Sequence, residues 1–247
     1  RMELHVDVDE ADVGRVREIN EDSFGMDAER GIFLVADGMG GHQAGEIASR
    51  LLVEKALERY AAGFNPRLKE KEIRDLLAEG IRKANRAIVD LAETDRAKRG
   101  MGSTVVALLF DEKRYYIGWV GDSRVYLMRK GELKRLTKDH SRVQALVDAG
   151  VITAAEALKH PNRNEITRAV GVRPEVEVDV VSDKAREGDV FLLCTDGVFG
   201  DMADEEFRGN ISSGDQAGEM ASALITRANE RGGEDNATVI VVRITDI

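Results

Sequence analysis

Apolar runs along the chain predict more strands than helices. Residues 4–8 alternate between apolar and polar side chains, which is typical of a half-buried strand, whereas residues 31–36 are apolar throughout, as in a strand buried on both faces. Further β-branched and aromatic runs predict strands at 103–110, 114–120, 123–129, 176–181, 189–195 and 237–244. Short turns separate the first three of these, so they form an antiparallel meander.

Helical spacing of apolar residues predicts helices at 45–60 and 69–92, helical character within 141–159, and a helix with an apolar stripe from Ala217 to Ala228. Strands that are apolar on both faces require two stacked sheets if they pair antiparallel, with helices over the outer faces. We therefore expect an α+β fold, a four-layer α-β-β-α sandwich of two mainly antiparallel sheets flanked by helices. No linker or repeat divides the chain, so we expect a single domain over residues 2–247.

Composition narrows the possible partners. Acidic residues outnumber basic ones by 46 to 36, and the net charge of −10 argues against nucleic-acid binding. The one cysteine, Cys194, lies in an apolar run, which predicts a packed and unreactive thiol in a reducing compartment. No stretch approaches the roughly 20 apolar residues of a membrane helix. We expect no membrane segment in this sequence, a cytoplasmic location and a monomer.

Aspartates recur where predicted strands meet loops. Asp37 and Asp196 each follow an apolar run and precede a glycine, and Asp122 and Asp235 lie at two further strand boundaries. Asp-Gly is also common turn chemistry, so any one of these aspartates could only cap a turn or a helix. If one end of the sheets gathers all four, they would repel one another unless cations neutralise them. Oxygen ligands without paired Cys or His indicate Mg²⁺ or Mn²⁺, and Gly38 would let a backbone carbonyl approach the metal.

Such a site suits the hydrolysis of phosphate esters. Two metal ions bridged by a carboxylate would activate a water for in-line attack on phosphorus. Arg17, which precedes the acidic pair Glu21 and Asp22, could hold the phosphate through its bidentate guanidinium. An ordinary surface ion pair is the alternative interpretation of Arg17.

The motifs, taken together, resemble the metal-dependent protein phosphatases, the type 2C serine/threonine phosphatases, in their bacterial single-domain form. The matching segments, in chain order, are RVREINEDS, VADGMGGHQAGEIAS, GSTVVALL, VGDSRVYLMRKGELKRLTKDHS, LVDAGVI through HPNRNEITRAVG, LLCTDGV and EDNATVIVV. The family's fold is the sandwich expected above. The resemblance implies hydrolysis of phosphoserine and phosphothreonine in proteins, in opposition to bacterial serine/threonine kinases.

The resemblance also implies a role for each matching residue. Asp37 would bridge two Mg²⁺ or Mn²⁺ ions, Gly38 would give its carbonyl to the second ion, and Asp196 and Asp235 would complete the first. A third ion would lie between Asp122 and Asp196.

Further roles lie around these ions. Arg17 would bind the phosphate, Glu21 and Asp22 would lie outside the metal ligands, with Asp22 acting through a bound water, and Asn236 would orient nearby groups. Residues from about 141 to 166 would form a flap beside the site, although a plain helical excursion gives the same pattern.

One position departs from the eukaryotic branch of the family, in which a histidine follows the Asp-Gly pair and protonates the leaving alcohol. Here that position is Met39, as in bacterial relatives. His42 could replace that histidine as the acid, or could only cap a helix, and a metal-bound water is the other candidate acid. His140 and His160 are expected to be structural.

Two other functions compete with this one. A phosphatase with an aspartyl nucleophile needs Asp-x-Asp after a strand, which neither Asp-Gly segment supplies. A catalytically inactive relative that binds phosphoproteins or regulates a partner would be expected to have lost a metal ligand or Arg17, and the sequence retains them all.

Overall fold

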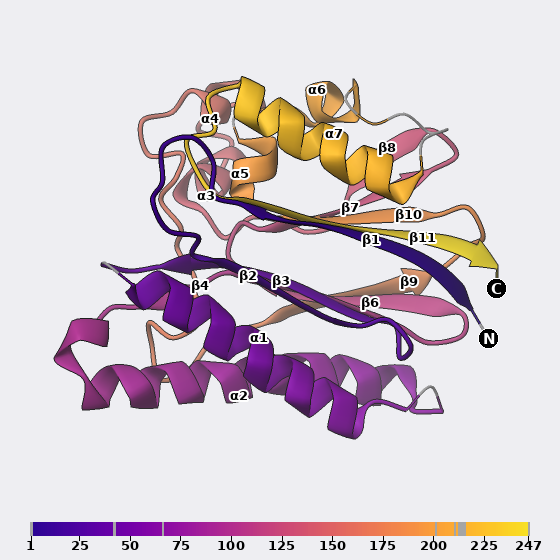
Figure 1. The fold of residues 1–247 in the computed structure, drawn as a ribbon, viewed down its shortest axis with the longest axis horizontal. Helices are drawn as coiled ribbons and strands as arrows, with labels where there is room; N and C mark the ends of the chain where they lie inside the picture. Colours follow the sequence, from indigo (N-terminus) through magenta and orange to yellow (C-terminus); the bar gives the residue numbers. More distant parts are fainter. Residues whose placement is uncertain are drawn as a thin grey trace.

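The computed structural model describes residues 2–41, 43–65, 67–200, 202–209, 211 and 216–246, with the side chains of residues 7–11 left out. Its strands form two sheets (Figure 1). The first sheet has the order β1-β11-β10-β7-β8, with strands β1 (Glu3–Asp12), β11 (Ala237–Asp246), β10 (Val190–Cys194), β7 (Arg124–Arg129) and β8 (Glu132–Arg135). Neighbouring strands in it pair antiparallel.

The second sheet has the order β2-β3-β5-β6-β9, and its neighbouring strands are also antiparallel. Its strands are β2 (Asp22–Asp27), β3 (Ile32–Met39), β5 (Val105–Phe110), β6 (Arg114–Val120) and β9 (Asp179–Lys184). A short strand, β4 (Gly102–Ser103), pairs with the end of β3.

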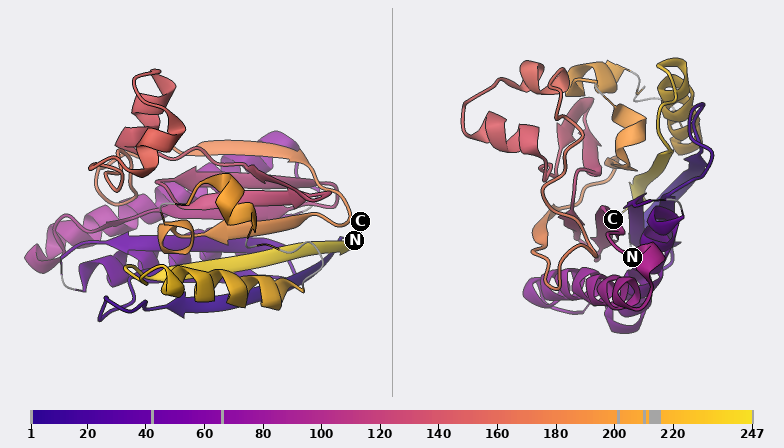
Figure 2. Two further views of the ribbon diagram at one scale, coloured as in Figure 1. Left: turned by 90° about the horizontal axis from the view of Figure 1, so that it is seen from above. Right: turned by 90° about the vertical axis from the view of Figure 1, so that its left-hand side faces the viewer.

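Helices cover the outer face of each sheet, which confirms the four-layer sandwich (Figure 1). Over the second sheet lie α1 (Ala44–Gly63) and α2 (Glu70–Thr94), and the short helix η1 (Arg96–Lys98) follows α2. The first sheet is covered by α5 (Asp196–Phe199), α6 (Asp204–Gly209) and α7 (Ala217–Glu230). Two more helices, α3 (Arg142–Asp148) and α4 (Ala154–Leu158), project from the sandwich (Figure 2).

Three apolar layers follow from strands that are apolar on both faces. Phe33, Phe110 and Phe191 lie between the sheets, with Phe110 packed edge-on against both other rings. The outer faces bury further apolar side chains against α1 and α2 on one side and against α7 on the other. This packing fixes both sheets, and therefore fixes the loops that leave their ends.

The structure corrects some details of the expected elements. The helical stretch at 141–159 is two short helices, because Gly150 adopts a φ of +68° after α3 and Thr153 starts α4 with a capping box to Glu156. Two strands, β2 and β8, were not predicted; their sequences, DSFGMD and ELKR, are rich in polar residues that rarely mark strands.

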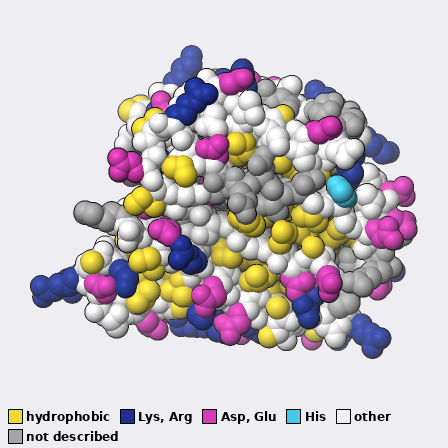
Figure 3. All heavy atoms as spheres, viewed as in Figure 1, with side chains coloured by type: hydrophobic (Ala, Val, Ile, Leu, Met, Phe, Trp, Pro, Cys, Tyr) yellow, Lys and Arg dark blue, Asp and Glu magenta, His cyan; other side chains and the backbone are white. Residues whose placement is uncertain are grey.

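The face of the molecule drawn in Figure 3 carries charges of both signs. Acidic and basic side chains are interspersed on the face drawn in Figure 3. Within the described residues, no helix combines the length and apolar character needed to cross a bilayer.

Candidate active site

The strand ends, the turn and the helix start that carry the aspartates singled out in the sequence lie at one end of the two sheets, away from the chain termini (Figure 1). Asp37 lies near the end of β3, directly opposite Asp22 at the start of β2. Asp196 opens α5 just after β10, Asp122 lies in the turn between β6 and β7, and Asp235 directly precedes the segment that enters β11. Antiparallel pairing of segments that are far apart in the sequence therefore brings these carboxylates to the same end of the sheets.

The glycine after each Asp-Gly aspartate is required by a close backbone approach. A Cβ at Gly38 would lie 2.1 Å from the carbonyl oxygen of Gly45, and a Cβ at Gly197 would lie 1.9 Å from that of Asn236. Neither glycine has a left-handed φ. The turn interpretation of Asp-Gly therefore does not apply here, since both glycines make room for a neighbouring loop.

Hydroxyl groups that sequence reasoning missed hold the backbone of Asp37. The Ser103 hydroxyl donates to the Asp37 carbonyl over 2.9 Å, and the Asp37 N–H donates to the Thr104 hydroxyl over 3.1 Å. The Thr104 hydroxyl also lies 2.7 Å from that of Ser123, beside Asp122. The Ser-Thr pair stands in the quoted GSTVVALL segment, but hydroxyls are too common on strands to indicate such a contact.

The carboxylates act electrostatically as one cluster. Burial, followed by Asp196 and then Asp22, raises the pKa of Asp37 well above its ordinary value. Burial, followed by Asp196, does the same for the pKa of Asp122. The pKa of Asp196 is raised by burial and then by Asp235. Repulsion among these groups is the cost of gathering them without a cation.

Asp22 is the most enclosed of these groups, with 7% of the residue exposed. One oxygen accepts hydrogen bonds from the hydroxyls of Thr238 (2.7 Å) and Thr195 (2.8 Å). Burial nevertheless raises the pKa of Asp22 to about 7. Its other oxygen, like Oδ1 of Asp196 and Oε1 of Glu21, is buried without a hydrogen-bond partner among the described residues. Buried acceptors of this kind call for a cation or an ordered water.

Arg17 and Asp235 form an ion pair at the edge of this cluster. Nη2 of Arg17 lies 2.9 Å from Oδ2 of Asp235, and the other oxygen of Asp235 accepts the N–H of Asn236 over 2.9 Å. The Arg17 side chain is 47% exposed. Asp235 also lies close enough to Asp196 to raise its pKa. The two oxygens of Asp235, however, are bonded to Arg17 and to the N–H of Asn236. Within the described part of the chain, no three acidic, histidine or cysteine side chains yet enclose a single point as metal ligands.

Asn236 fixes the loop that carries Arg17. Its side-chain amide donates to the carbonyls of Val13 (2.9 Å) and Ile19 (3.0 Å), and its Oδ1 accepts the N–H of Glu21 (2.8 Å). The Glu21 carbonyl in turn accepts the N–H of Gly38 over 3.0 Å. One amide therefore ties the Arg17 loop to the backbone beside the acidic cluster.

The segment predicted as a flap, at about 141–166, contains α3 and α4 and stands beside the acidic end (Figure 2). Arg163 and Asn164 line a pocket of about 210 Å³ together with Asp196 and Asp235. His140, just before the flap, accepts the N–H of Gly121 and stacks on a tryptophan, and burial lowers its pKa. The ring nitrogen of His160 likewise accepts a backbone N–H. His42 lies outside the described residues.

Comparison with known proteins identifies the family to which this sequence is similar. Residues 15–231 match the model of the family described as Protein phosphatase 2C. The serine/threonine phosphatase stp of Listeria welshimeri is 38% identical over 234 residues, which cover 94% of this chain and 92% of that protein. The serine/threonine protein phosphatase PstP of Mycobacterium tuberculosis is 41% identical over 96% of this chain, which spans 44% of that longer protein.

Solved structures agree. The crystal structure of the Mycobacterium tuberculosis phosphatase PstP/Ppp superposes with a TM-score of 0.90 at 39% identity, covering 98% of this chain and 99% of that one. A structure of the PstP catalytic domain in complex with two manganese ions has a TM-score of 0.85 at 37% identity, and all of both chains is covered. The fold, the acidic end of the sheets and these similarities agree: the chain belongs to the protein phosphatase 2C family.

Proposed function

We propose that this chain hydrolyses phosphoserine and phosphothreonine in proteins at the acidic end of its sheets, in a reaction that depends on Mg²⁺ or Mn²⁺. Asp37 would bridge two ions, with the carbonyl of Gly38, Asp196 and Asp235 as further ligands. Asp122 and Asp196 would hold a third. When bound, the ions supply a water of lowered pKa and positive charge to offset that of the phosphate.

The donor set fits such ions. It offers only oxygen, which hard divalent cations prefer, and Oδ1 of Asp196 is buried without a hydrogen-bond partner among the described residues. To serve as a ligand, Asp235 would turn from Arg17 towards Asp196. That movement would release the Arg17 guanidinium for the phosphate, so cation binding and substrate binding would favour each other.

Other groups of the chain orient the reaction. The hydroxyls of Thr195 and Thr238 hold one oxygen of Asp22, so its remaining oxygen can accept a proton from a nearby water. Asn236 keeps the Arg17 loop in place. His42 stays a candidate for the acid that protonates the leaving alcohol. The observation that carries the proposal is the gathering of buried carboxylates at one site, where Asp196 and Asp22 both raise the pKa of Asp37.

Hydrolysis of a phosphothreonine peptide tests this proposal. We expect activity with Mn²⁺, none after EDTA, and a loss of at least about 100-fold in Asp196→Ala, since the ligand is removed outright. Asp75→Asn, on the exposed face of α2, is the matched control and should keep full activity. Activity that survives chelation would contradict the metal mechanism. A folded chain that is inactive with every divalent ion would support the alternative of a non-catalytic phosphoprotein-binding protein. None of the described residues gives an independent reason to prefer that alternative.

The proposal extends to the setting of the reaction. Phosphoproteins made by a bacterial serine/threonine kinase would be the substrates, with the kinase itself among them. The single catalytic domain over 2–247 with its flap, the monomeric state and the cytoplasmic location stay predictions.

A further inference from the structure

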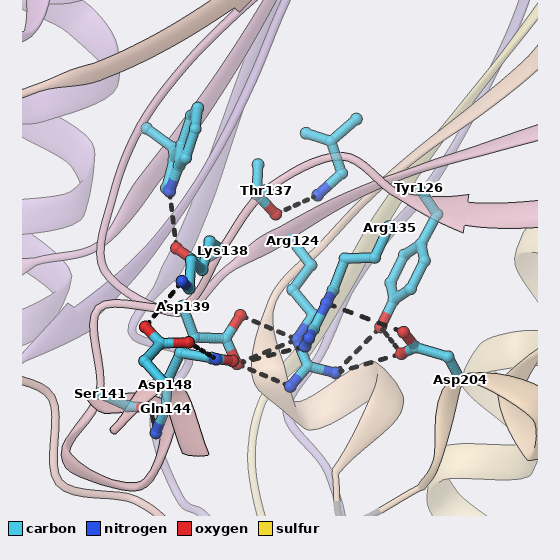
Figure 4. Close-up of polar contacts among 12 residues, drawn as sticks. Arg124, Tyr126, Arg135, Thr137, Lys138, Asp139, Ser141, Gln144, Asp148 and Asp204 are labelled. Carbon is cyan, nitrogen blue, oxygen red and sulfur yellow. Dashed lines mark hydrogen bonds and ion pairs between the residues drawn. The ribbon is translucent and has the colours of Figure 1, made fainter. Parts of the chain in front are cut away.

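A second charged cluster is centred on Arg124, the first residue of β7 (Figure 4). The Arg124 guanidinium grips Asp139 through Nε (3.1 Å) and Nη2 (2.7 Å), and the two side chains are only 11% and 9% exposed. Its third nitrogen donates to the hydroxyl of Tyr126 over 2.9 Å, and that hydroxyl donates to Asp204 over 3.1 Å. Arg135 stands 3.7 Å from both carboxylates. All three guanidinium nitrogens are therefore occupied.

Arg124 lies next to two of the proposed metal ligands. It is two residues after Asp122, and it pairs across the sheet with Cys194, two residues before Asp196. Its guanidinium carbon lies 3.8 Å from the ring centroid of Phe199, the last residue of the single-turn helix that Asp196 opens. The arginine thus packs against both backbone segments that carry these aspartates.

Asp139 belongs to the root of the flap. On one side of it, Trp119 donates to the carbonyl of Lys138 over 2.9 Å, and Lys138 pairs with Asp148 at the far end of α3 over 2.7 Å. On the other side, Ser141 caps the start of α3. Figure 4 shows these contacts converging on the 138–141 segment. Any shift of Asp139 would therefore carry α3 with it.

We propose that Arg124 is a positioning residue that holds the flap root, Asp122 and the helix of Asp196 as one rigid joint. The inference rests on the proposed function of these aspartates. A buried ion pair is weak evidence for a role in stability, because desolvation costs about as much as the attraction returns. The location of this pair, at the junction of three functional segments, indicates positioning instead.

Arginine is required for this joint because of its shape. Its planar guanidinium bonds a carboxylate with two nitrogens while its face lies on an aromatic ring. The ammonium group of lysine cannot make both contacts at the same time. Arg124→Lys should therefore loosen the joint although it keeps the charge. The same strand offers a matched control: Arg129 grips the buried Asp189 with distances of 2.7 and 2.6 Å, far from the flap.

The test measures Mn²⁺ binding by calorimetry and amide hydrogen exchange of residues 142–148, and neither reports on turnover. We expect Arg124→Lys to weaken binding of at least one Mn²⁺ ion by about 10- to 100-fold, as loss of groups that orient ligands typically does. It should also speed exchange in α3. Asp139→Asn, which alters no proposed ligand, should do both. Arg129→Lys should change Mn²⁺ affinity less than about threefold and leave α3 protected.

Two results would overturn the inference. If Arg124→Lys binds Mn²⁺ as tightly as the wild type and its α3 exchanges at the same rate, Arg124 does not position the joint. The proposed function would still stand in that case, provided that the unmodified chain is active with Mn²⁺. Equal effects of Arg129→Lys would reduce the role to general stability. If Arg124→Lys does not fold, as thermal unfolding will tell, Asp139→Asn carries the same test. A wild-type chain that binds no Mn²⁺ would instead contradict the proposed function.

Discussion

Without metal, the folded chain should lose stability as the pH rises through the weakly acidic range, and Asp22 is the clearest source. Burial raises the pKa of Asp22 from its ordinary 3.8 to about 7, against the opposing effect of the Thr238 and Thr195 hydroxyls. Between these values the folded chain keeps a proton that the unfolded chain has released. Because the unfolded chain then binds fewer protons, the free energy of unfolding falls as the pH rises.

The size of the effect follows from the shift. The difference between 3.8 and about 7 corresponds to about 4 kcal/mol at about 1.36 kcal/mol per unit. From pH 5 to pH 6.5 the loss is about 2 kcal/mol for this one proton. Asp37 and Asp122, whose pKa values are also raised, would steepen the decline.

Urea unfolding, followed through the fluorescence of the buried Trp119, measures this loss at several pH values in EDTA. Asp22→Asn keeps the acceptor for both hydroxyls but carries no charge, so the decline should be shallower by about 1.4 kcal/mol per pH unit. Asp75→Asn, on an exposed helix face, should keep the wild-type slope. With saturating Mn²⁺ the decline should vanish, since cations replace the protons. An unchanged slope in Asp22→Asn would refute this reasoning.

Three substitutions test other parts of the account. Gly38→Ala would place a methyl group 2.1 Å from the carbonyl of Gly45, so we expect a loss of about 1–3 kcal/mol in thermal unfolding together with loss of hydrolysis; full activity would contradict the close approach. Asn236→Ala should cost about 1–3 kcal/mol and lower kcat/KM for a phosphopeptide, because the loop 13–21 loses its anchor; unchanged kinetics would show that the loop holds without it. Tyr60→Phe removes one buried hydrogen bond to α2, so chemical denaturation should show a loss of about 1 kcal/mol with activity intact; a drop in activity would reveal long-range coupling.

Much of the architecture could be predicted from the sequence because it depends on burial. Strands apolar on both faces, such as 31–36, have no stable place except between two layers, and the observed sandwich provides it. The helices at 44–63 and 70–94 agree with their apolar stripes within a few residues. The polar strand β2 escaped prediction because its stability comes from pairing with β3, which local pattern does not encode.

The site was harder to predict in its details, because contacts across the sheets decide them. The ion pair of Arg17 with Asp235 joins residues 218 positions apart, and nothing local indicates it. The hydrogen bonds of Arg124 to Asp139 were not predicted either, although both residues stand in one motif of the sequence, because their local pattern does not indicate that the two side chains meet. Hydroxyls such as that of Thr195 carry no pattern at all. The sequence does indicate the aspartates at the ends of buried strands, because their charges need a partner that the neighbouring residues do not supply.

A crystal grown with Mn²⁺ and measured at the manganese absorption edge tests the central claim most directly. The account predicts at least two anomalous peaks, with one ion in contact with Asp37, Asp196 and Asp235 and the side chain of Asp235 turned away from Arg17. Manganese peaks elsewhere, with Asp37 and Asp196 bonded only to protein groups and Asp235 still paired with Arg17, would contradict it.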